Sequence, residues 1–138
     1  KTIRAKWWHI CRIASFINCK IRRKRMTTDE LDKKHCVPCE GGVEPLDMAA
    51  AKQIAQAIDP AWNISDDATY IEREFKFANY DKTISFVNAV AWIAESEDHH
   101  PDLVVKYGSC GVKYSTHSIG GLSENDFICA KKIDNMIS

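Results

Sequence analysis

Hydrophobic and polar positions follow two different rhythms along the first half of the folded part of the chain. From Asp47 to about Pro60 the apolar residues recur every three or four positions, which predicts a helix with Asp47 as its N-cap. Residues 61–77 instead alternate apolar and polar side chains, as half-buried strands do. The polar residues 65–67 interrupt the alternation and indicate the turn of a hairpin. A helix followed by two antiparallel strands is therefore expected.

The same order returns in the second half. Asn79 precedes a helical pattern that reaches about Asp98. Residues 103–107 are then expected to be extended, residues 108–111 to form a turn, and residues 112–117 to alternate as a second strand. The expected buried stripe of the long helix consists of Ile84, Val87, Ala91 and Ala94, flanked by Phe86, Val90 and Ile93.

A third helix is expected at the C-terminal end. Ser123 offers a hydroxyl at the N-cap position and Asp126 a carboxylate three residues later, which is close to a capping box. The order helix, two strands, helix, two strands, helix predicts an α+β fold, with three helices packed on one face of a four-stranded antiparallel sheet. We divide the chain into a basic extension at 1–25, a leader at 26–44 and a folded domain at 45–138.

Charge divides the chain more sharply than hydropathy does. Residues 1–25 contain nine Lys or Arg and no acidic residue, whereas the rest contains ten basic and nineteen acidic residues, so that the whole is neutral. The acidic body would repel phosphate backbones, and we expect no nucleic acid partner for it. The basic arm either precedes the natural start at Met26, or targets an organelle or membrane surface, or binds a partner or nucleic acid. No apolar run is long enough to predict a membrane-spanning helix.

Histidines form the most informative cluster. His99 and His100 are adjacent at the expected end of the long helix, with Glu95 and other carboxylates nearby, and His117 lies near the end of a later strand. Because imidazole titrates near neutrality, such a cluster can supply both a general acid and a general base. The same residue types also bind zinc or iron, or lie on the surface at a helix end, where the helix dipole stabilises them. Residue types alone leave these three interpretations open.

Two cysteines of the leader have a spacing of their own. Cys36 and Cys39 are separated by two residues and follow His35. This spacing is typical of half of a zinc site or of a redox pair. The remaining ligands of a complete zinc site are not evident, because Cys110 and Cys129 occur singly. We therefore expect free thiols, with Cys129 packed in the core.

Spacing narrows the choice among the histidine interpretations. Seven residues form the series Glu95-x3-His99-His100-Pro101-x5-Tyr107-x9-His117-x8-Asp126. This series resembles the signature of the pterin-4a-carbinolamine dehydratase family, and the segment HHPDLVVKYGSCGVKYSTHSIGGLSENDF is similar to the family throughout. Trp62 resembles the family's Trp at the start of its first strand, and CVPCEGGVEPL is similar to the leader of bacterial-type members. The resemblance covers about residues 35–135.

The resemblance implies an enzyme, a hydro-lyase, with the fold expected above. Members convert 4a-hydroxytetrahydropterin, released by aromatic amino acid hydroxylases, into quinonoid dihydropterin and water, with pterin as the substrate and no metal or cofactor. Substrate contacts are implied for Trp62, His100 and Pro101. A homodimer or homotetramer, functional coupling to a hydroxylase, and a cytoplasmic location unless the arm directs the protein to an organelle are also implied. The alternative is a non-enzymatic binding module, because animal members also act as dimerisation cofactors of a transcription factor.

The resemblance also assigns the catalytic roles by position. His99 and His117 would be the proton-transfer pair, and His100 would hold the pterin and assist. Asp126 is expected to orient or charge-stabilise His117, and Glu95 to do the same for His99. Which imidazole acts as acid and which as base stays open.

Overall fold

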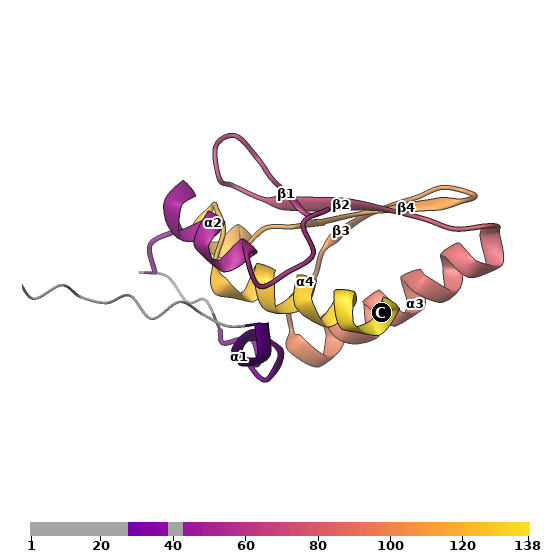
Figure 1. Cartoon of the computed structure of the whole chain (residues 1–138), viewed down its shortest axis with the longest axis horizontal. Coiled ribbons are helices and arrows are strands. Elements are labelled where there is room, and N and C mark those ends of the chain that lie inside the picture. Colours follow the sequence, from indigo (N-terminus) through magenta and orange to yellow (C-terminus); the bar gives the residue numbers. More distant parts are fainter. Residues whose placement is uncertain (1–27, 39–42) are drawn as a thin grey trace, which may run out of the picture.

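A four-stranded sheet lies over a layer of helices (Figure 1). The computed structural model describes residues 28–38 and 43–138, and the basic arm at 1–25 lies outside them. Among the described residues, no helix combines the length and the apolar character needed to cross a bilayer. In chain order the elements are α1 (Thr28–Asp32), α2 (Met48–Ala55), β1 (Asn63–Ile64), β2 (Ile71–Lys76), α3 (Tyr80–Glu97), β3 (Asp102–Val105), β4 (Ser109–Tyr114), the 3-10 turn η1 (His117–Ile119) and α4 (Glu124–Ile137).

The sheet is antiparallel throughout, with the strand order β1-β2-β4-β3. The alternation along β2 and β4 separates its two faces, because successive side chains of a strand point to opposite sides. Ile71 and Phe75 of β2 are buried, whereas Glu72 and Glu74, which lie between them in the strand, are exposed. The predicted hairpin turn at 65–67 joins β1 to β2, with the Ala68 amide donating to the Ser65 carbonyl at 2.9 Å.

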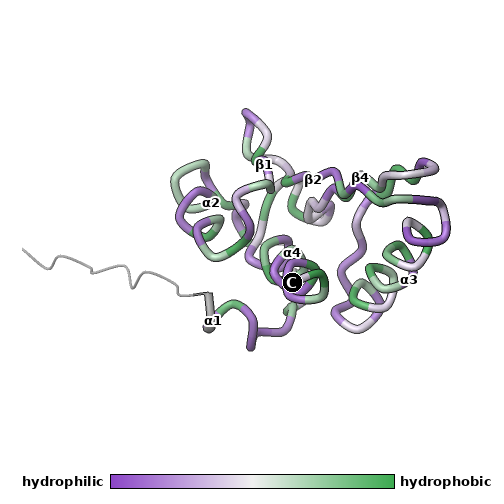
Figure 2. Tube along the Cα trace, turned by 45° about the vertical axis from the view of Figure 1, so that its right-hand side comes forward, coloured by the Kyte–Doolittle hydropathy of each residue, from purple (hydrophilic) through white to green (hydrophobic). Residues whose placement is uncertain are grey.

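The helices cover the apolar face of this sheet. Figure 2 shows α4 in the middle of the layer, between α2 and α3. Most of the first half of α4 is buried, including Phe127 and Ile128, and these residues belong to one core with the inner side chains of the sheet. Leu31 of α1 is fully buried in the same core, so part of the leader packs against the folded domain.

The predicted helix caps are confirmed. The side chains of Asp47 and Asn79 accept hydrogen bonds from the backbone amides of Ala50 and Lys82, at 2.7 and 3.0 Å. Ser123 opens α4 with a complete capping box. These contacts satisfy amides that a helix start otherwise leaves without partners. The α+β fold expected from the pattern is confirmed, while the short α1 was not expected.

The predicted stripe of α3 was correct for Ala94, which is buried, but the centre of the buried face is rotated toward the residues expected to flank it. Ala91 is exposed, whereas Phe86 and Val90 are buried. Phe86 packs against Phe75 and Phe77, with ring centroids 4.6 and 5.0 Å apart, and burying these rings contributes more than burying an alanine.

The predicted turn at 108–111 was also displaced. Lys106 donates its amide to the Ser109 carbonyl at 2.8 Å, so the turn spans residues 106–109 and β4 already begins at Ser109. Gly111 lies inside β4 opposite Val104, where an added Cβ would come within 3.7 Å of the Val104 Cβ. Because that distance is an ordinary van der Waals contact, a side chain would fit at this position, and Gly111 is a strand residue and not part of a turn.

Candidate functional site: a histidine-lined cavity at the end of the sheet

The end of α3 sends two adjacent histidines in different directions. Asp98 follows the helix in the left-handed conformation, with φ of 48°, and the His99 amide donates to the Ala94 carbonyl at 3.1 Å. This is the Schellman arrangement that often ends helices. His99 leaves this turn buried at 9% exposure, while His100 is exposed. As expected for consecutive residues, the two imidazoles diverge.

His99 is paired with a fully buried carboxylate. Its Nε2 lies 2.7 Å from Oδ1 of Asp126, in the first turn of α4. The other carboxylate oxygen accepts hydrogen bonds from the Thr116 hydroxyl at 2.9 Å and the Ser123 amide at 2.8 Å. Asp126 is thus held on both oxygens, and it fixes the orientation of the His99 ring.

The expected partner of Asp126 is corrected by this pairing. Asp126 was expected to act on His117, but His117 is the exposed first residue of η1. The capping box holds Asp126 inside the fold, facing the chain that leaves α3, and this orientation favours His99. Glu95, the expected partner of His99, is exposed, and no hydrogen bond or ion pair joins the two side chains in the described part of the chain.

One face of the His99 ring packs against aromatic side chains of the core. The His99 ring stacks on Tyr114 with centroids 5.6 Å apart and an interplanar angle of 8°. Burial, followed by the neighbouring Cys129 thiol, raises the pKa of Tyr114, so its hydroxyl stays protonated. Trp62 packs against Tyr114 at 6.4 Å and donates its indole N–H to Asp134 at 2.9 Å. Trp62 is therefore a core residue that reaches the site only through Tyr114.

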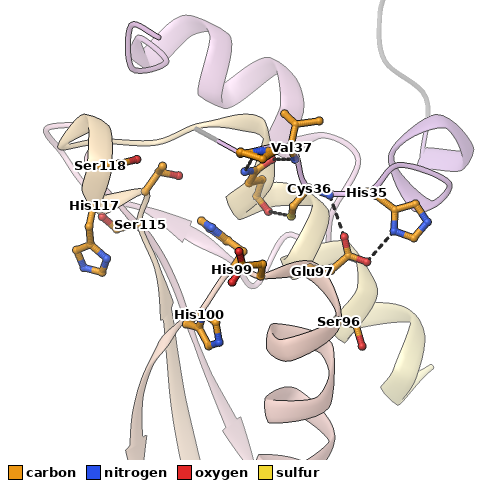
Figure 3. A pocket seen from close by; sticks show the side chains of 14 residues that line it. His35, Cys36, Val37, Ser96, Glu97, His99, His100, Ser115, His117 and Ser118 are labelled. Atoms are coloured by element: carbon orange, nitrogen blue, oxygen red, sulfur yellow. Dashed lines mark hydrogen bonds and ion pairs between the residues drawn. The ribbon is translucent and has the colours of Figure 1, made fainter. Parts of the chain in front are cut away.

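The three expected histidines come together around one cavity. Figure 3 shows His99, His100 and His117 beside this cavity of about 550 Å³, which Ser115 and Thr116 also line. The volume is in the range typical of sites for small molecules. Neither Pro101 nor Glu95 lines it. In the described part of the chain, no group of three His, Cys, Asp or Glu side chains is arranged to hold a metal ion.

Residues 35–38 of the leader, which we call the strap, form another wall of the cavity. Glu97, at the end of α3, accepts the Cys36 amide at 2.8 Å and lies 3.0 Å from Nδ1 of His35 and 3.2 Å from Nζ of Lys132. Burial alone would raise the pKa of Glu97, but these three donors outweigh it and hold the pKa below its ordinary value. The ionised carboxylate thus ties the strap to α3 and α4.

A second anchor holds the strap from α4. Asn125 accepts the Val37 amide at 3.2 Å and donates to the Val37 carbonyl at 2.8 Å, as a neighbouring strand would. Cys36 also directs its thiol at the Asn125 carbonyl, 3.7 Å away. The strap is therefore fastened to the two helix ends that carry His99 and Asp126 (Figure 3).

Sequence reasoning missed several of these residues. Thr116 was expected only as part of an alternating strand, and Glu97 was not singled out among the acidic residues near the histidines. The capping box already placed Asp126 at a buried helix start, which was a usable signal. Nothing in the local pattern indicates that Glu97 and Asn125 hold a segment about 60 and 90 positions away in the chain.

Comparison with known proteins places the chain in a family. A family model described as pterin 4 alpha carbinolamine dehydratase matches residues 44–136. Two proteins named "Putative pterin-4-alpha-carbinolamine dehydratase" are similar to it. The one from Nitrosospira multiformis is 53% identical over 110 residues, which are 80% of this chain and 95% of that protein. The one from Nitrosomonas europaea is 51% identical over 105 residues, 76% of this chain and 91% of that protein.

A solved structure supports the same placement. A crystal structure from Brucella melitensis, described as a transcriptional coactivator/pterin dehydratase, superposes with a TM-score of 0.64 at 29% identity. The match covers 69% of this chain and 100% of that one. Sequence and fold agree, and the chain belongs to the pterin-4a-carbinolamine dehydratase family.

Proposed function

We propose that the protein dehydrates 4a-hydroxytetrahydropterin to quinonoid dihydropterin. In this reaction the proton on N5 is removed, the bond between C4a and the hydroxyl oxygen breaks, and a double bond forms between N5 and C4a. The departing hydroxyl takes up a proton and leaves as water, so one water is lost and no electron is transferred. One general base and one general acid therefore suffice, and we propose that no metal or other cofactor takes part.

The His99–Asp126 pair is the observation that carries this proposal. The Nε2 atom of this buried imidazole lies 2.7 Å from a buried carboxylate oxygen, and this contact holds the ring in one orientation. In proton-transfer sites such a carboxylate fixes the tautomer and stabilises the imidazolium that forms during reaction. We assign His99 as one proton-transfer residue and Asp126 as its positioning residue.

His117 is assigned as the second proton-transfer residue and His100 as a residue that holds the pterin. Both are exposed and line the same cavity as His99, so a flat bicyclic ring bound there has an imidazole on more than one side. We propose that the protein takes its substrate from an aromatic amino acid hydroxylase, since such hydroxylases release 4a-hydroxytetrahydropterin, and that a separate reductant must convert the quinonoid product to tetrahydropterin before the hydroxylase uses it again.

The direct test is an assay of the excess rate over spontaneous dehydration. An aromatic amino acid hydroxylase generates the substrate in place, and the quinonoid product is followed by ultraviolet absorbance with a chelator present. We expect acceleration by the wild-type protein that survives the chelator. His99→Ala is expected to lower the excess rate by at least about tenfold.

Two results would contradict the proposal. Folded wild-type protein without any acceleration would exclude the dehydratase activity. Acceleration that disappears with chelator and returns on adding a metal ion would exclude the metal-free reaction.

A binding role is the second candidate function, because the Brucella melitensis protein is described as both a transcriptional coactivator and a pterin dehydratase. The observation that favours it here is exposed apolar surface, with Trp92 of α3 at 75% and Val104 of the edge strand β3 at 60% exposure. For either function, we propose that further copies of this chain cover part of this surface, including Trp92, in a homodimer or homotetramer. Light scattering is expected to give a multiple of the chain mass, and Trp92→Asp is expected to reduce it. A monomeric wild-type protein would contradict the homo-oligomer.

A further inference from the structure

Two thiols from distant parts of the chain are in contact at the wall of the cavity. Sγ of Cys36, in the strap, lies 3.7 Å from Sγ of Cys129, in α4, although 93 positions separate the two residues. Cys36 is half-buried and lines the cavity, whereas Cys129 is fully buried. Both are free thiols in this structure. The proposed dehydration uses neither of them.

The surroundings hold the pair together and, among the described residues, leave the cavity as the approach to it. The strap cannot drift from α4 without breaking the Asn125 hydrogen bonds to Val37 and the Glu97 hydrogen bond to the Cys36 amide. On the core side, the Tyr114 ring and hydroxyl close the space beside Cys129. A small molecule therefore reaches the pair from the cavity, and it meets Cys36 first.

We propose that Cys36 and Cys129 form an oxidation site that a peroxide converts into a disulfide. In the first step the Cys36 sulfur attacks one peroxide oxygen, the O–O bond breaks, and Cys36 becomes a sulfenic acid while water leaves. In the second step Cys129 attacks the Cys36 sulfur, and the sulfenic oxygen leaves as a second water. The two thiols lose two electrons, hydrogen peroxide gains them, and two water molecules form.

The geometry needs only a modest shift of the strap. A disulfide has an S–S length of about 2.05 Å, so the two sulfurs must approach from their present van der Waals contact. Residues 34–38 belong to no helix or strand, whereas Cys129 lies within the rigid α4. Cys36 is thus the member of the pair that moves.

The pKa of Cys36 controls the rate at which its sulfur attacks the peroxide. Sharing its hydrogen bond with Cys129, together with burial, raises the pKa of Cys36 well above the ordinary value of a thiol. Because the thiolate is the nucleophile, the oxidation is slow at neutral pH and accelerates as the pH rises.

The disulfide would fasten the strap by a covalent bond. It closes a loop between positions 36 and 129, and long loops gain most from such closure because the unfolded chain loses many conformations. We expect the thermal midpoint of the oxidised protein to rise by on the order of 10 °C and to return on reduction. Exchange of the Val37 amide with solvent is expected to slow as well.

Peptide mapping of the full-length wild-type protein tests the proposal without any variant. The protein is treated with hydrogen peroxide, the remaining thiols are alkylated, and the unreduced protein is digested with trypsin. Cleavage after Lys and Arg places Cys36 in peptide 35–52, Cys129 in peptide 114–131 and Cys110 in peptide 107–113. We expect peptides 35–52 and 114–131 joined with the loss of two hydrogen atoms, and peptide 107–113 alkylated.

Four variants, one of them a control, identify the bond. Cys39 shares peptide 35–52 with Cys36 and lies outside the described residues, so Cys39→Ser should keep the link while Cys36→Ser and Cys129→Ser should abolish it. Cys110→Ser, a buried thiol in β4, serves as the matched control and should also keep it. A link that survives Cys36→Ser, or a bond confined to peptide 35–52, would overturn the proposal. So would complete alkylation of both peptides after prolonged peroxide treatment at high pH.

Discussion

The two sides of the cavity hold their imidazoles in opposite ways. His99 is buried, stacked on Tyr114 and held by Asp126, which two further donors hold in turn. His100 and His117 are exposed, and within residues 28–38 and 43–138 only the backbone of a helix end and of a short turn positions them. The difference indicates a division of labour, in which one imidazole is fixed before substrate binds and the others adjust to the bound ring.

Removing the imidazoles one at a time should give the largest effects. His99→Ala and His117→Ala are each expected to lower the excess dehydration rate by at least about tenfold, because each removes a proton-transfer group. Only His99→Ala should also lower the free energy of unfolding, by roughly 1–3 kcal/mol, since it leaves Oδ1 of the buried Asp126 without its hydrogen-bond partner. Denaturant unfolding beside the rate assay separates the two. Wild-type rates in a folded variant would remove that histidine from the mechanism.

Neutralising Asp126, the carboxylate that holds His99, should have the next largest effect on the dehydration rate. Asp126→Asn is expected to lower the excess rate by about 10-fold to 100-fold, because a neutral amide no longer stabilises an imidazolium at His99. Asp134→Asn is the matched control, since Asp134 is also a buried carboxylate of α4 but accepts from Trp62 and Arg73. Both variants should lose stability, and only Asp126→Asn should lose most of its rate per folded molecule. Equal rate losses would contradict a specific role for Asp126.

Loosening Asp126 without removing its charge should produce a smaller change. Thr116→Val deletes the hydroxyl that donates to Asp126 at 2.9 Å and lies 2.7 Å from the Ser123 hydroxyl. We expect a loss of roughly 1–2 kcal/mol in the free energy of unfolding. Thr116→Ser should recover most of it, because it restores the hydroxyl. If Thr116→Ser were as unstable as Thr116→Val, packing of the methyl group and not the hydrogen bond would be responsible.

The anchor of the strap should appear as a weak pH dependence of stability. The pKa of Glu97 is lower in the folded protein than in the unfolded chain, where it is about 4.3. Its contribution is therefore complete above about pH 5 and is lost as the pH falls through the folded-state pKa. Glu97→Gln should flatten this acid-side decline when unfolding is followed from pH 6 to 3, and Glu72→Gln, an exposed residue of β2, should not. An unchanged profile in Glu97→Gln would contradict the anchoring role.

The sequence predicted local structure better than it predicted the partners in the site. Caps at Asp47, Asn79 and Ser123 depend on a few neighbouring residues, and all of them were found where the pattern placed them. The three histidines were also identified together, because their spacing resembles a family signature. The pairing of Asp126 was not, because it depends on which direction a buried side chain faces when two helix ends meet.

The contacts of Trp62 and of the leader could not be predicted from local sequence either, because they also depend on how distant elements pack together. The expected role of Trp62 as a pocket residue came from the resemblance, whereas its burial behind Tyr114 follows from packing between β1, β4 and α4. Cys36 was considered only with its neighbour Cys39. Its contact in the fold is Cys129, and no spacing rule within the leader indicates that.

The central claim is that Asp126 acts through His99, and a double-mutant cycle on the excess dehydration rate tests it most directly. Asp126→Asn is measured in the wild-type, His99→Ala and His117→Ala backgrounds. We expect it to lower the rate by the same factor in the wild-type and His117→Ala backgrounds, and to have little further effect once His99 is absent. A full effect in the His99→Ala background, together with none in the His117→Ala background, would show that Asp126 serves His117 and would contradict the account.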